Sequence, residues 1–124
     1  MQSIIRKKSY DSVKVFFLNR KLLVEQIEQA AAELVTERPE VRKIILFGSV
    51  AEGRALPSSD IDLLLITDRN TERFIDRPSP YIPYFQHIPM SVDCFVYSVE
   101  EIQSGNHSIP VTAIKTGTVL FERG

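Results

Sequence analysis

Three aspartates have the residue type and spacing to do chemistry. Asp60 and Asp62 open the apolar run "SDIDLLL", and Asp93 lies inside a second run, "MSVDCFVY". Asp is disfavoured in strands, and a carboxylate beside a buried sheet is costly unless a cation meets it. Residues two apart on a strand point to the same face, about 6.6 Å apart along the chain. Asp60 and Asp62 would therefore project together and raise each other's pKa, which predicts a bound cation.

The three carboxylates suit a particular class of ion. Aspartate oxygens are hard ligands for Mg²⁺ or Mn²⁺, which usually keep waters and take further ligands from substrate phosphates. Asp93 would converge with Asp60 and Asp62 if its strand lies beside theirs. Three such carboxylates could hold two metals about 3.5–4 Å apart, the arrangement used for in-line phosphoryl displacement. The residues alone therefore make all three candidate metal ligands.

The pair Gly48-Ser49 would supply the other half of this site. It follows the apolar run "VRKIILF" and opens a short helix predicted over Ser49 to Arg54. Backbone N–H groups at such a turn face an incoming anion. Gly48 would let a phosphate approach without a Cβ in the way, and the Ser49 hydroxyl would add a donor. The combination predicts a site for a metal–nucleoside triphosphate.

The Gly-Ser turn and the three aspartates, taken together, resemble the motif of the minimal nucleotidyltransferases of the DNA polymerase-beta-like superfamily. The matching stretch is "GSVAEGRALPSSDIDLLL", in which ten residues separate Gly48-Ser49 from Asp-x-Asp, with Asp93 on a later strand. The similarity covers about residues 12–100. These small prokaryotic domains are often antitoxins paired with HEPN proteins. The resemblance implies a single polymerase-beta-like domain, α/β in the broad sense (α+β), with a mixed sheet packed against helices.

The resemblance also implies an activity and its site, with Asp60, Asp62 and Asp93 as the catalytic carboxylates and metal ligands. Mg²⁺, as two ions and replaceable by Mn²⁺, would support transfer of a nucleotidyl group, usually AMP from ATP, with release of pyrophosphate. Many family members read Ala-Arg-Gly where this chain has "AEG", so Glu52 replaces a cation near the phosphates and Arg54 would take its place. The expected nucleotide contacts are Gly48, Ser49, Arg54 and Ser59.

Regular elements must position these residues. A helix is predicted from about Arg20 to about Glu37, with Asn19 as its N-cap and Pro39 closing the segment. Ser98 and Glu101 form a capping box for a later helix, and Gly117 would be the C′ residue of another. The predicted strands are residues 12–18, 41–47, 61–67, 90–97 and 118–122. Together they predict a mixed α/β or α+β domain with a three- to five-stranded sheet.

Length and composition narrow the function classes. A chain of 124 residues predicts one domain, residues 1–124, without room for the helical acceptor-binding domain of small-molecule nucleotidyltransferases. The resemblance therefore suggests a HEPN-type helical protein as acceptor. The net charge of −1 disfavours nucleic acid, and no apolar stretch reaches the roughly 20 residues that span a membrane. The single cysteine, Cys94, favours a reducing, cytoplasmic location, and homo-oligomerisation stays open.

Plainer interpretations compete with the chemical one. Asp60 and Asp62 could cap the turn after "PSS", and Asp93 could accept a hydrogen bond from a neighbouring group. Ser49 could be only a helix N-cap. The alternative function is a non-catalytic nucleotide-binding antitoxin that neutralises a partner by occlusion, which Glu52 favours. Polymerisation onto nucleic acid is disfavoured because no basic groove is evident.

Overall fold

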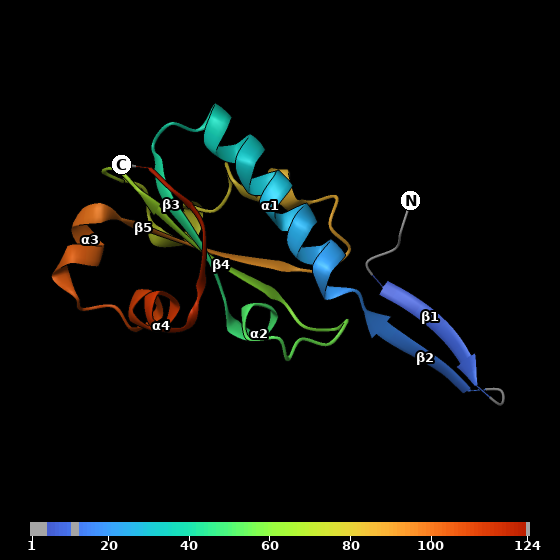
Figure 1. Ribbon diagram of the computed structural model, residues 1–124. Helices are drawn as coiled ribbons and strands as arrows, with labels where there is room; N and C mark the ends of the chain where they lie inside the picture. The colour runs from blue at the N-terminus through green and yellow to red at the C-terminus, as the bar shows by residue number, and fades with distance from the viewer. Residues whose placement is uncertain (1–4, 11–12, 124) are drawn as a thin grey trace.

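A four-stranded mixed sheet forms the centre of the fold (Figure 1). The computed structural model describes residues 5–10 and 13–123. Its sheet has the order β5-β4-β3-β6, in which β4 and β5 are parallel and β3 is antiparallel to both β4 and β6. The strands are β3 (Val41–Phe47), β4 (Ile61–Thr67), β5 (Val92–Ser98) and β6 (Thr118–Glu122). The predicted fold class, α+β with three to five strands, is confirmed.

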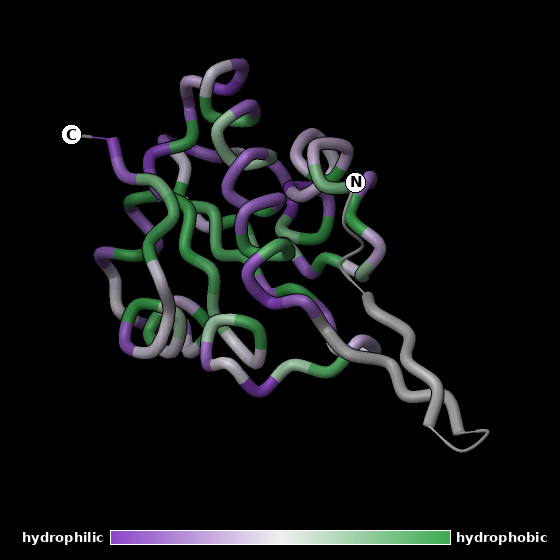
Figure 2. The backbone as a smooth tube through the Cα atoms, turned by 45° about the vertical axis from the view of Figure 1, so that its right-hand side comes forward, coloured by the Kyte–Doolittle hydropathy of each residue, from purple (hydrophilic) through white to green (hydrophobic). Residues whose placement is uncertain are grey.

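Both faces of the sheet are covered, because the central strands carry apolar side chains on both sides. Helix α1 (Arg20–Glu37) and the 3-10 segment η2 (Ile82–Phe85) pack on one face. Helices α3 (Val99–Ser104) and α4 (Ser108–Thr116) pack on the other. Figure 2 shows the hydrophobic strands running between these helices. Because side chains alternate between the two faces of the sheet, successive residues of a strand pack against different helix layers.

Helix α1 has the predicted bounds, for the predicted reasons. The Asn19 side chain accepts a hydrogen bond from the Leu22 N–H at 3.2 Å, which caps the first turn. The helix ends before Pro39. Its buried residues recur at helical spacing and face the sheet: Leu23, Ile27, Ala30, Ala31 and Leu34.

Other elements agree with the sequence except at their ends. β5 begins at Val92, two residues later than predicted. The capping box is present, since Ser98 Oγ accepts from the Glu101 N–H and Glu101 Oε1 accepts from the Ser98 N–H. The helix after β3, α2 (Gly48–Ala51), is shorter than the one predicted over residues 49–54. The chain leaves it through Gly53, whose φ of +76° suits a glycine.

The amino-terminal strand prediction was incomplete. β2 (Val13–Leu18) confirms all of it but residue 12, which lies outside the described residues. β1 (Ile5–Tyr10) was not predicted, because its run of basic residues lacks an apolar pattern. The two strands pair antiparallel in a separate sheet ahead of α1 (Figure 1). Backbone pairing between neighbours in sequence defines this hairpin.

Gly117 ends α4 in a different way from the one predicted. It is extended, with φ −89° and ψ 176°, and not the left-handed residue typical of a glycine at C′. A Cβ there would lie 2.5 Å from both Ala113 O and Ile45 Cγ2. Glycine is needed because the end of α4 packs directly on β3. Within residues 5–10 and 13–123, no helix has the length and hydrophobicity needed to cross a bilayer.

Candidate active site

Strand pairing brings two of the predicted carboxylates together. In the parallel pair β4–β5, Asp62 is in register with Asp93, so both side chains project from the same face of the sheet. Asp60 lies just before β4. On the other side of β4, Phe47 is the register partner of Asp62. The site therefore lies at the edge of the sheet where β3 ends and where β4 and β5 begin.

The electrostatics of this edge show that the carboxylates interact. The pKa of Asp62 is raised, first by burial and then by the negative charges of Asp93 and Asp60. None of the ion pairs found among the described residues involves any of the three. This edge therefore concentrates negative charge that no described cationic side chain neutralises through an ion pair.

Gly48 closes this edge from the β3 side. Its φ is +75°, a backbone conformation that residues other than glycine rarely adopt. A Cβ at this position would overlap the carboxylate of Asp62. The sequence predicted Gly48 as an open approach for phosphate, and the structure adds a second reason, which is room for Asp62 itself. Ser49 follows in the first turn of α2, half-buried beside the carboxylates' strand.

Arg54 and Ser59, the other predicted nucleotide contacts, are engaged within their own loop. Arg54 Nη2 lies 3.3 Å from Glu52 Oε2, and both side chains are exposed. Ser59 closes a turn just before Asp60, since its Oγ accepts from the Leu56 N–H and its N–H donates to the Leu56 carbonyl, each at 2.9 Å. Their roles in nucleotide binding stay predictions.

The donor set fits a hard divalent cation. Among the residues that the structure describes, no three His, Cys, Asp or Glu side chains form a group that could hold a metal ion by themselves. Mg²⁺ does not need such a cage, because it is usually held by one or two carboxylates together with waters and substrate phosphates. Asp62 and Asp93, with Asp60 beside them, are the residues that would hold it. The two-ion arrangement stays a prediction.

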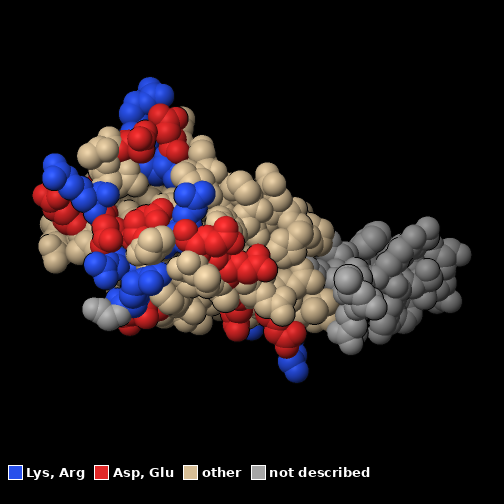
Figure 3. Space-filling view, turned by 90° about the horizontal axis from the view of Figure 1, so that it is seen from above, with Lys and Arg blue, Asp and Glu red and all other residues tan. Residues whose placement is uncertain are grey.

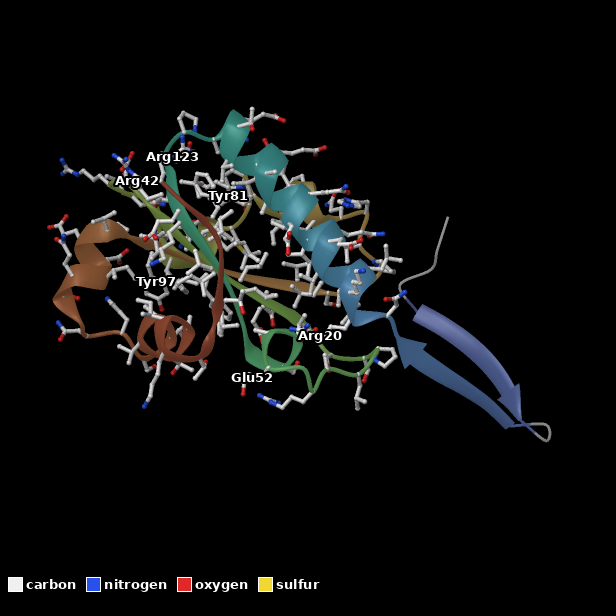
Figure 4. All side chains as sticks on the ribbon, in the orientation of Figure 1. Arg20, Arg42, Glu52, Tyr81, Tyr97 and Arg123 are labelled. Carbon is white, nitrogen blue, oxygen red and sulfur yellow. The ribbon has the colours of Figure 1, made fainter. Side chains whose placement is uncertain are left out.

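Arg20 is a residue near this site that sequence reasoning missed. Its Nε donates to the Val50 carbonyl at 3.1 Å and its Nη2 to the Ala51 carbonyl at 3.2 Å. Figure 4 shows the side chain between the start of α1 and α2. One signal was available in the sequence: a cation in the first turn of a helix opposes the helix dipole and needs another reason to be there.

A cavity of about 760 Å³ lies at the opposite end of the sheet. It is lined by Arg42, Asp68, Arg69, Val99, Glu100, Gln103 and Arg123. Arg42 is paired with Asp68 at 2.5 Å, and Arg123 donates to two backbone carbonyls. Figure 3 shows basic and acidic side chains interspersed over the described part of the upper face. The unpaired carboxylates, and not this cavity, have the chemistry of a reactive site.

Comparison with known proteins identifies the family of the chain and agrees with its fold. A family model described as a nucleotidyltransferase domain matches residues 24–111, so the chain belongs to this family. The matched segment contains Gly48, Ser49 and all three aspartates. Among curated protein sequences no significant match was found.

Three solved structures have a similar fold. A protein from Sulfolobus solfataricus assigned as a nucleotidyltransferase has a TM-score of 0.62 and 21% identity, with 84% of each chain covered. A toxin–antitoxin with AMP-PNP has a TM-score of 0.57 and 21% identity, covering 77% of this chain and 73% of that one. The toxin–antitoxin MntA-HepT has a TM-score of 0.51 and 19% identity, covering 82% and 72%. At these identities the likeness concerns the fold.

Proposed function

We propose that the chain is a Mg²⁺-dependent nucleotidyltransferase that moves AMP from ATP to a hydroxyl of a partner protein, as the antitoxin of a toxin–antitoxin pair. One observation carries the proposal: Asp62 and Asp93 are in register beside Gly48, the pKa of Asp62 is raised, and neither carboxylate forms an ion pair with a described residue. Membership of the nucleotidyltransferase family supports the reaction class. Two similar structures are toxin–antitoxin assemblies, one of them with AMP-PNP, which supports the partner and the nucleotide.

The chain's own residues have distinct parts in this reaction. Bound metal would polarise the phosphates and neutralise the charge that develops on them. The Gly48-Ser49 turn would orient the triphosphate through backbone N–H groups and the Ser49 hydroxyl. Asp93 would accept the proton of the attacking hydroxyl. A tyrosine is a suitable acceptor, since its phenol is more acidic than a serine hydroxyl.

The decisive experiment uses the Asp93→Asn variant with the purified protein encoded by the neighbouring gene, Mg²⁺ and α-³²P-ATP. We expect the wild type to label the partner, with an intact-mass gain of one AMP. The variant should bind Mg²⁺–nucleotide yet transfer at least about 100-fold more slowly, because losing a general base alone typically costs this much. Equal labelling by both proteins would exclude Asp93 from the mechanism.

The second candidate is a non-catalytic antitoxin that neutralises its partner by occlusion. The Glu52–Arg54 pair favours it, because a carboxylate meets the cation expected to contact the triphosphate. A partner that the wild type neutralises without any gain in mass would support this alternative and overturn transfer.

A further inference from the structure

We infer that Arg20 is a positioning residue, which holds the Gly48–Ala51 turn over the carboxylates so that the turn can bind triphosphate. This inference rests on the proposed function for its ligand but not for its geometry. Arg20 lies 30 residues from Val50 in sequence, and its guanidinium donates to the carbonyls of Val50 and Ala51 at 3.1 and 3.2 Å. It is therefore a tether between α1 and α2.

The position of Arg20 at the start of α1 is unfavourable for that helix considered alone. It is the first residue of that helix, where the helix dipole favours an acid, and the first turn contains none. The same guanidinium lies at the carboxyl end of α2, where the carbonyls are electron-rich and a cation is favourable. A residue that opposes its own element but satisfies another is typical of a functional constraint.

Helix α2 needs such support because it is very short. Four residues cannot form a stable helix by their own hydrogen bonds. The contacts that hold the turn include the buried Val50 side chain, the close approach of Gly48 to Asp62, a contact with α4, and the two bonds from Arg20. The Arg20 bonds come from α1, outside the sheet that carries the site, and they hold the carboxyl end of α2. Without these bonds the turn can shift relative to Asp62, and its N–H groups would no longer point toward the phosphates.

The test compares Arg20→Met, Arg20→Lys and the matched control Lys21→Met. Arg20→Met removes both bonds, whereas Lys keeps the charge but cannot reproduce the two-pronged geometry. Lys21→Met removes the same charge from the adjacent exposed position. If Arg20 acts by position, Lys should resemble Met. If it acts by charge, Lys should resemble the wild type, which would overturn the inference.

The first readout is hydrogen exchange in the nucleotide-free protein. The amides of Glu52, Gly53 and Arg54 donate to carbonyls of Gly48, Val50 and Ser49, so they report the closed turn. We expect about tenfold faster exchange in Arg20→Met and Arg20→Lys, the scale of two lost hydrogen bonds, and no change in Lys21→Met. Unchanged exchange in Arg20→Met would overturn the inference whether or not the protein is an enzyme.

The second readout is function. Calorimetric affinity for Mg²⁺ with a non-hydrolysable ATP analogue should fall about five- to tenfold in Arg20→Met and Arg20→Lys. KM for ATP should rise by a similar factor, while kcat changes by less than about twofold. If exchange quickens but affinity is unchanged, the turn does not bind triphosphate and the inference fails. If the wild type itself shows no affinity, the proposed function fails, and hydrogen exchange alone still decides whether Arg20 holds the turn.

Discussion

Acids at the two ends of the β4–β5 pair have opposite electrostatic settings. At the start of these strands, Asp62 and Asp93 have no cationic partner among the described residues, and the pKa of Asp62 is raised. At the far end, Asp68 is paired with Arg42, and Glu101 lies 2.7 Å from Arg77.

The pKa of Glu101 shows what pairing does. Burial acts to raise it, but the hydrogen bond from Arg77 and those from Ser98 outweigh burial, and the pKa is lowered. Asp62 is also partly buried, but the charges that shift its pKa are those of the carboxylates Asp93 and Asp60. Among the described residues, Asp68 and Glu101 each have a cationic partner, whereas Asp62 and Asp93 have none. This contrast supports an external cation at the site.

The largest expected effect concerns Asp62→Asn. Nucleotidyl transfer should fall at least about 100-fold, since the variant loses a metal ligand. Its unfolding free energy in metal-free buffer should rise slightly, by less than about 1 kcal/mol, because a half-exposed repulsion is partly screened. The measurements are the labelling rate and urea unfolding.

The control for this prediction is Asp68→Asn, which should leave transfer unchanged. The stability difference should also depend on pH. Since the folded-state pKa of Asp62 is raised, the wild type gains stability as pH falls through that pKa, and its difference from Asp62→Asn should vanish in acid. A large loss of stability in Asp62→Asn would show that Asp62 stabilises the fold, and would contradict the proposed difference between the two ends of the β4–β5 pair.

Next in size is Arg77→Met at the paired end. Its side chain is only 9% exposed and donates to Glu101, to the Val96 carbonyl and to the Glu72 carbonyl. Removing it should lower the unfolding free energy by about 2–3 kcal/mol, since the half-buried carboxylate of Glu101 and two backbone carbonyls lose their partner. Chemical denaturation of purified proteins measures this loss.

Arg73→Met is the matched control, because Arg73 pairs with Asp76 on the surface, where the arginine side chain is 82% exposed. It should cost less than about 0.5 kcal/mol. The lowered pKa of Glu101 adds a pH signature: its stabilisation is full above the ordinary glutamate pKa and is lost as pH falls through the lowered one. Equal losses in Arg77→Met and Arg73→Met would show that the paired end is not structural.

A smaller effect is expected from ligand addition. Mg²⁺ or Mn²⁺ with a nucleoside triphosphate at ten times its Kd should raise the melting temperature by about 4 °C. The double variant Asp60→Asn, Asp62→Asn should fold but show no such rise. Thermal unfolding with and without ligand tests this, and an equal rise in both proteins would place the metal elsewhere.

The smallest effect is predicted for Glu52→Gln. Freed from Glu52, Arg54 should bind the triphosphate about two- to fivefold more tightly, because an exposed ion pair is worth little. Glu52 is the C-cap residue of α2 (Figure 4). Calorimetry measures the gain, and the exposed Glu72→Gln is the control for charge. A gain that persists when Arg54→Gln is added would show that Arg54 does not contact the nucleotide.

Local patterns in the sequence predicted much of the framework. Helix α1 follows its apolar spacing between the Asn19 cap and Pro39, and β4 follows an uninterrupted apolar run. Elements whose conformation depends on contacts elsewhere in the chain were harder to predict from the sequence. β1 has no apolar pattern, and Gly117 reflects the packing of α4 on Ile45 of β3, not a left-handed turn.

The sequence by itself determined which residues could react: carboxylates two apart at a strand entrance, a third acid inside another apolar run, and a glycine after a strand. Their residue types and their spacing are given directly by the amino-acid sequence. Only the tertiary structure decided that Asp62 and Asp93 are register partners, and that Gly48 lies against Asp62. It alone revealed Arg20 on the carbonyls of α2. The physical reason is that strand register and interhelical contacts depend on how the whole core packs, which no single segment encodes.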